Sequence, residues 1–123
     1  MHVLIVDDNL ITASAIQTQL WTQGHTATTV GSARHALDVL RMQGPHVAIV
    51  NLAAHGFDAA EAIQTLRGDP AQGRVRIIGF CGHTDQIRRS GALDAGADLV
   101  ITNAQALKTL TDVMNRSPSD RSS

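Results

Sequence analysis

The sequence has little of what marks extracellular, membrane or nucleic-acid-binding proteins. Aromatic residues make up only 2% of its 123 residues, and tyrosine is absent. A single cysteine excludes an internal disulfide and favours a reducing, cytoplasmic location. The 10 Lys and Arg residues are balanced by 11 acidic ones, which leaves no basic excess for direct nucleic-acid binding. No apolar run approaches the roughly 20 residues that cross a bilayer, so we expect no membrane partner.

The hydrophobic content is ordinary, at 43%, and must be packed with Ala, Val, Ile and Leu. This length fits one domain with a substantial core. We expect that domain to cover residues 1–116. The ending SPSDRSS, residues 117–123, is small and polar, as in a flexible tail or the start of a linker. The opening MHVLIVDDN lacks the charged start of a signal peptide.

Short apolar runs alternate with stretches of helical spacing, which predicts an α/β fold. Strands are expected at 2–6, 25–30, 46–50, 74–80 and 98–102. Helices are expected around 10–20, 33–40, 59–66, 84–95 and 104–116. Asp58, with Glu61 three residues later, is typical of a helix start. Continuous apolar strands alternating with helices predict a doubly wound domain of three layers, with a parallel sheet covered on both faces.

Functional groups in such sheets gather outside the carboxyl ends of the strands. The positions that end or follow the expected strands are therefore expected to share one site. They hold Asp7 and Asp8, Asn51, Cys81 with Gly82 and His83, and Thr102 with Asn103.

The stretches VLIVDDN, PHVAIVNLAAHGFDAAEAI and ALDAGADLVIT resemble the receiver domain of bacterial two-component response regulators. This resemblance implies a flavodoxin-like (βα)5 fold with strand order 2-1-3-4-5. It also implies a phosphorylation switch: an aspartate ending the third strand accepts a phosphoryl group, Mg²⁺ is held by that aspartate and an acidic pair, and a hydroxyl residue and a lysine bind the phosphoryl oxygens. An aromatic residue on the fifth strand reports the state.

Carried over by position, only the acidic pair of that switch remains, as Asp7 and Asp8. The phosphoacceptor position is Asn51. The hydroxyl position is Cys81 and the lysine position is Asn103, while Val100 replaces the aromatic residue. An amide is a poor nucleophile and a weak metal ligand, so Asn51 is not expected to accept phosphate. Two carboxylates where the family has three imply at most weak Mg²⁺ binding, with no cofactor required.

These departures predict an atypical receiver, a pseudo-receiver that is not an enzyme and acts by phosphorylation-independent protein–protein interaction. The alternative is a sensor whose modified pocket binds a metal ion or small anion. A third hypothesis, ranked lowest, is phosphotransfer to another acceptor such as Asp8 or Asp58.

Several of these residues also have plainer interpretations. Asp7 and Asp8 could belong to the start of the first helix, and we expect Asn103 to cap the fifth. Cys81 is better interpreted as a small core residue than as a reactive thiol. The six histidines match no zinc spacing; His55, His83 and Cys81 are expected near the acidic pair and the others at scattered positions.

In the family, the surface of the fourth helix, fifth strand and fifth helix mediates docking. The expected partner is a kinase, another signalling protein or an output domain, or a second copy of the chain. In this chain the residues of that docking surface are Gln86, Arg88, Arg89, Leu107, Lys108 and Thr111.

Overall fold

The computed structural model describes residues 1–69 and 75–115. Their strands are β1 (His2–Val6), β2 (Thr26–Val30), β3 (Val47–Asn51), β4 (Arg76–Cys81) and β5 (Leu99–Thr102). Their helices are α1 (Leu10–Thr22), α2 (Ala33–Gln43), α3 (Ala59–Arg67), α4 (Gln86–Ala95), α5 (Asn103–Lys108) and α6 (Leu110–Asn115). The expected tail at 117–123, the start of the strand predicted from residue 74 and the end of the helix predicted to residue 116 lie outside the described residues.

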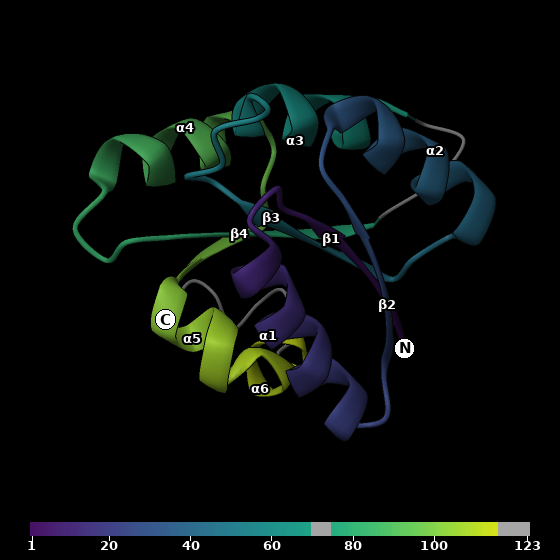
Figure 1. Ribbon diagram of the computed structural model, residues 1–123. Helices are drawn as coiled ribbons and strands as arrows, with labels where there is room; N and C mark the ends of the chain where they lie inside the picture. Colours follow the sequence, from purple (N-terminus) through teal and green to yellow (C-terminus); the bar gives the residue numbers. More distant parts are fainter. Residues whose placement is uncertain (70–74, 116–123) are drawn as a thin grey trace.

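The five strands form one parallel sheet in the order β2-β1-β3-β4-β5, which confirms the predicted doubly wound, flavodoxin-like fold. Helices α2, α3 and α4 cover one face of this sheet, and α1, α5 and α6 cover the other (Figure 1). The strand order reverses between β1 and β3, which places a crevice outside their carboxyl ends.

The sheet is buried on both faces, as the apolar runs predict. Leu4 and Val50 pack beneath α2 and α3, whereas Ile5 and Ile49 belong to the core on the α1 side, because successive side chains alternate across a strand. Aromatic residues contribute little, since Phe80 is buried but Trp21 is 77% exposed. The core is therefore almost wholly aliphatic.

The prediction of one continuous fifth helix is wrong, because it breaks at Thr109 into α5 and α6. Gln19 of α1 lies at the break. Its Nε2 donates to the Ala106 carbonyl at 2.8 Å, and its Oε1 accepts the Leu110 N–H at 2.9 Å. In an unbroken helix those two backbone groups would bond to each other, so the inserted amide replaces the helical hydrogen bond.

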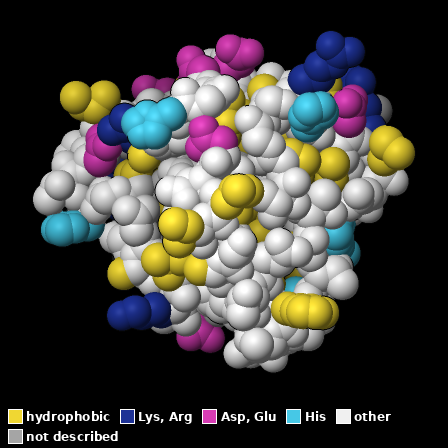
Figure 2. All heavy atoms as spheres, in the orientation of Figure 1, with side chains coloured by type: hydrophobic (Ala, Val, Ile, Leu, Met, Phe, Trp, Pro, Cys, Tyr) yellow, Lys and Arg dark blue, Asp and Glu magenta, His cyan; other side chains and the backbone are white. Residues whose placement is uncertain are grey.

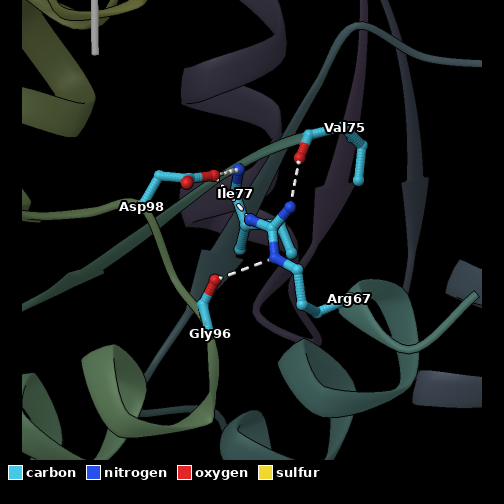
Figure 3. Close-up of polar contacts among 5 residues, drawn as sticks. All are labelled: Arg67, Val75, Ile77, Gly96 and Asp98. Atoms are coloured by element: carbon cyan, nitrogen blue, oxygen red, sulfur yellow. Dashed lines mark hydrogen bonds and ion pairs between the residues drawn. The ribbon is translucent and has the colours of Figure 1, made fainter. Parts of the chain in front are cut away.

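At the amino-terminal end of β4 and β5, Arg67 joins three segments (Figure 3). Its guanidinium donates to the carbonyls of Gly96 and Val75, both at 3.0 Å, and to Asp98 Oδ2 at 2.5 Å. The same Asp98 oxygen accepts the Ile77 N–H at 2.9 Å. The end of α3 is thereby fastened to the start of β4 and to the α4–β5 turn.

Candidate functional site

The carboxyl ends of the strands enclose a cavity of about 340 Å³ that contains several of the predicted site residues. Asp8, Asn51 and Asn103 line it, together with His55 and Phe80. Asp7 is 2% exposed and is tied to Asn51. The strand ends thus bring together Asp7, Asp8, Asn51 and Asn103, as expected, and His55 joins them.

Asn51 is bonded through both ends of its side-chain amide. Its Nδ2 donates to Asp7 Oδ1 at 2.9 Å, and its Oδ1 accepts the Ala53 N–H at 2.9 Å. A carboxylate can only accept and a backbone N–H can only donate, so this orientation satisfies both neighbours and the reverse would satisfy neither. An aspartate at this position would instead set a second negative charge against Asp7.

The two acidic residues also hold the surrounding loops. Asp7 Oδ1 accepts the Asn9 N–H at 2.9 Å, and Asp8 Oδ2 accepts the Gly56 N–H. Gly56 allows that close approach, because a Cβ there would lie 2.6 Å from Asp8 Oδ2. The N-cap of α1 is Asn9, whose side chain accepts the N–H groups of Ile11 and Thr12. The acidic pair therefore precedes the cap and faces the loops.

Asp7 retains one oxygen, Oδ2, that is buried and has no hydrogen-bond partner among the described residues. Such an oxygen suits a hard divalent cation, so Asp7 and Asp8 fit part of the Mg²⁺ site that the fold family implies. The third position presents Nδ2, a donor, toward Asp7. Across residues 1–69 and 75–115, no three His, Cys, Asp or Glu side chains are arranged to hold a metal.

The structure places Cys81 and Val100 in the core and not on the cavity wall. Cys81 belongs to β4, and burial raises the pKa of its thiol, with a smaller contribution from Asp85. A buried thiol with a raised pKa is a poor nucleophile at neutral pH. Val100 is 6% exposed in β5.

The expectation that Asn103 caps the fifth helix is wrong by one residue. Thr102 is the N-cap and forms a capping box with Gln105: its side chain accepts the Gln105 N–H at 3.1 Å, and Gln105 Oε1 accepts the Thr102 N–H at 2.9 Å. Asn103 is the first helical residue and its side chain lines the cavity.

The expected docking residues lie around the β5 edge of the sheet. Helix α4 lies on one face of the sheet and α5 and α6 lie on the other, so the docking residues flank this edge from both faces (Figure 1). Arg88 pairs with Asp85 at 2.6 Å, and its hydrogen bonds lower the pKa of that carboxyl. Arg89 donates to the Val100 carbonyl at 3.2 Å. Leu107 also lines the cavity, and Thr111 is half-buried.

The histidines expected at scattered positions include a group that sequence spacing did not reveal. His2 Nδ1 lies 2.6 Å from the Thr26 hydroxyl, and the His2 N–H donates to His46 Nδ1 at 3.3 Å. His25 Nδ1 lies 2.9 Å from the amino terminus. This group is at the amino ends of the strands, at the opposite end of the sheet from the cavity. Register alone could have found it, because each histidine begins or precedes a strand.

The family model described as the response regulator receiver domain matches residues 3–115. Transcriptional regulatory protein AfsQ1 of Streptomyces coelicolor is 27% identical over 78% of this chain, and CseB of Streptomyces avermitilis is 27% identical over 82%. The matches span only 41% and 42% of those two proteins. In the described part of the chain, no helix is long and apolar enough to cross a membrane.

Solved structures show the same fold. The receiver domain of a sensor histidine kinase from Pseudomonas aeruginosa PAO1, with magnesium coordinated in its active site cleft, superposes with a TM-score of 0.83 at 21% identity, covering 96% of this chain and 97% of that one. A response regulator from Chloroflexus aurantiacus gives 0.80 at 19% identity, covering 94% and 98%.

Proposed function

Because the chain belongs to the response regulator receiver domain family, we propose that it is a degenerate receiver of two-component signalling that acts through protein contacts without being phosphorylated. The observation that carries this proposal is the hydrogen bond from Asn51 to Asp7. It occupies the position where the family places its phosphoacceptor and a metal ligand.

The chemistry of Asn51 opposes phosphoryl transfer. An amide nitrogen is delocalised and uncharged, and the amide oxygen already accepts the Ala53 N–H. Phosphoryl transfer depends on positioning and on stabilising charge, yet Asn103 and Cys81 provide neither a cation nor a hydroxyl group. The two other candidate acceptors have structural roles: Asp8 holds the Gly56 N–H, and Asp58 caps α3 by accepting the Glu61 N–H at 3.2 Å.

Mg²⁺ is not required to keep this pocket assembled. Where an ordinary receiver sets carboxylates side by side, a neutral donor here meets Asp7. A bound divalent cation would neutralise the acidic pair and would be held by Asp7 Oδ2 and Asp8. For Asn51 to join them through Oδ1, that atom must give up its bond to Ala53, which makes the site weak.

The proposed docking surface is the one around β5. Ile87 on α4 is 87% exposed and Leu93 is 47% exposed, so this side presents apolar groups beside Arg88 and Arg89. The proposed partner is a protein of the same signalling pathway, such as a kinase or an output domain. The proposed folded unit is residues 1–116.

A second candidate function is a sensor of a metal ion or small anion. It is favoured by the cavity and by the buried, unpartnered Asp7 Oδ2. Stoichiometric metal or a bound anion in purified protein would favour it over the first proposal.

The test is incubation with a small phosphoryl donor and Mg²⁺, followed by intact mass measurement. The wild-type mass is expected to stay unchanged, whereas Asn51→Asp, which restores the nucleophile, gains one phosphoryl group. A phosphorylated wild-type chain would overturn the proposal.

Docking is tested with the candidate kinase or output domain of the pathway. Ile87→Asp is expected to weaken binding at least tenfold, because it removes an exposed apolar group from the proposed docking surface. Since the side chain is 87% exposed, the substitution should leave the fold unchanged. Asn51→Ala should leave binding nearly intact. The opposite ranking would favour the sensor.

A further inference from the structure

The two edges of the sheet are protected very differently. At the β5 edge, the Arg89 guanidinium bonds to the Val100 carbonyl and so covers an edge acceptor. At the other edge, β2 contains neither a charged residue nor a proline, although these are the usual devices against edge-to-edge pairing. The β2 edge is thus open to another strand.

Helix α1, which lies beside β2 on one face of the sheet, carries no charged residue either. The sequence has no Asp, Glu, Lys or Arg anywhere from 9 to 33. Leu10, Ser14, Gln17 and Trp21 have the spacing of one helical stripe. Gln17 and Trp21 line a groove of about 200 Å³ together with His25, Thr26 and Ala27 of the β2 side, so this stripe borders the strand.

Helix α2, beside β2 on the other face of the sheet, also presents an uncharged stripe next to the strand. Gln43 Oε1 accepts the Thr28 hydroxyl at 2.8 Å, which identifies the side of α2 that faces β2. The residues next to Gln43 on that side are His35, Val39 and Met42. Arg34 and Arg41 lie farther round the helix, and Asp38 borders the stripe one turn from Met42. Met42 is 84% exposed and Trp21 is 77% exposed.

Together these two stripes and the strand form what we call the β2 face. In Figure 2, acidic and basic side chains gather over the α2–α4 side, whereas the lower right of the view, over β2 and the end of α1, shows hydrophobic, histidine and uncharged groups. Burial and the nearby amino terminus lower the pKa of His25, which disfavours its protonated form.

We propose that the β2 face is a self-association surface, on which two copies of this chain pair their β2 strands antiparallel about a two-fold axis. The sheet then continues from one copy into the other. The axis sets the α1 stripe of one copy against the α1 stripe of its partner, and likewise for α2, because a two-fold interface is formed by the same patch on both copies.

Charge and area both favour a second copy as the occupant. Any charge near the axis would meet itself, and neither the strand nor either stripe carries one. The nearest charges are the amino terminus, 2.9 Å from His25 Nδ1, and Asp38, one helical turn from Met42. A helix of this length is about 20 Å long, and three layers about 10 Å apart span about 30 Å. This gives about 600 Å² per copy and about 1,200 Å² in total, the lower end of specific interfaces. The dimer is therefore expected to be of micromolar affinity.

The test follows the whole chain by analytical ultracentrifugation from roughly 5 to 500 µM, together with the fluorescence of its only tryptophan. A monomer–dimer equilibrium is expected, and Trp21 should become at least twofold less accessible to iodide as the dimer forms. Gln17→Lys and Met42→Lys each place a charge against its own copy and should weaken the dimer at least tenfold. The matched control is Ala15→Lys, because Ala15 is exposed on α1, does not line the groove and is not three or four residues from any member of the stripe. Circular dichroism checks that each variant is folded.

A chain that stays monomeric over this range would overturn the proposal. It would also be overturned if Ile87→Lys, near the opposite edge of the sheet at β5, abolished a dimer that Gln17→Lys left intact. The proposal is independent of the phosphorylation state of the pocket, so it can fail while the proposed function stands.

Discussion

A single amide determines the character of the pocket. Where the family places a carboxylate that shares a cation with the acidic pair, Asn51 donates to Asp7 and accepts from Ala53. A neutral donor beside a buried carboxylate stabilises its charge in the way that a metal would, although more weakly. One Asp7 oxygen is thereby satisfied by Asn51, whereas Oδ2 stays buried without a partner among the described residues.

This arrangement makes the Asn51→Asp variant informative. The substitution loses the hydrogen bond and adds a negative charge beside Asp7, so we expect about 1–3 kcal/mol of lost stability without divalent cations. Mg²⁺ should restore much of the loss, because three carboxylates bind it better than two. Thermal unfolding with and without Mg²⁺ measures both effects. Asn51→Ala is the control, which should be destabilised but not rescued; equal stability of Asn51→Asp and wild type without Mg²⁺ would contradict the interpretation.

Phosphorylation of Asn51→Asp is expected to change little beyond the pocket. A ligand shifts a two-state equilibrium only by binding the two states differently, and Asn103, Cys81 and Val100 offer few such contacts. Amide chemical shifts with a phosphoryl mimic should therefore change near residue 51 but not across 100–112. Spread of the shifts into that segment would show that the switch is intact and merely lacks its acceptor.

At the scale of helices and strands, periodicity predicted every strand and four of the five helices, because apolar spacing is a local property of the sequence. It failed at the fifth helix. Leu107, Leu110 and Met114 have helical spacing, but the break depends on Gln19, which is remote in sequence. The expectation that Asn103 caps this helix was also off by one residue, since Thr102 and Gln105 form the cap together and the helix starts at Asn103.

The role of Gln19 is tested by Gln19→Ala. Removing the amide leaves the Ala106 carbonyl and the Leu110 N–H without their partner, which should cost about 1–3 kcal/mol. Hydrogen exchange should accelerate at 106–111 more than elsewhere. Gln17→Ala on the exposed side of α1 should have neither effect at dilute concentration. Slower exchange at 106–111 in Gln19→Ala would contradict this prediction. It would mean that α5 and α6 join into one helix once the amide is removed.

The Arg67 junction requires a glycine at residue 96. Gly96 has a φ of 121°, and a Cβ there would lie 3.1 Å from Arg67 Cγ. Gly96→Ala should therefore destabilise the fold by about 1–3 kcal/mol. Gly91 lies within α4 with open space around it, so Gly91→Ala should stabilise the fold by about 0.5–1 kcal/mol. Urea unfolding of both variants measures the contrast, and equal effects would contradict it.

For the molecule as a whole, the rarity of aromatic residues was evident from the sequence, but their locations were not. The sequence also predicted which strand ends would meet, because all parallel strands present their carboxyl ends at one edge. It could not predict which oxygen of Asp7 is left unpartnered or that Asn51 would satisfy the other. Those facts depend on side-chain geometry between remote segments.

Tryptophan fluorescence is consequently expected to be a poor reporter of unfolding. Trp21 is 77% exposed, so in dilute protein its emission should already resemble that of a solvated indole and change little in denaturant. Circular dichroism should show a full transition under the same conditions. Phe80→Trp, in the core, provides the contrast: its emission should be blue-shifted until the protein unfolds. A large shift in the wild type below 5 µM would contradict the exposure of Trp21.

The bond between Asn51 and Asp7 has a consequence for regulation. A phosphorylated receiver carries information that decays with the lifetime of its acyl phosphate. On the proposed function this chain carries no such mark, so its signal would instead follow the number of copies present, which synthesis and degradation control. A dimer of micromolar affinity would make that number matter, because doubling the copies would change the proportion of paired chains as well as their total.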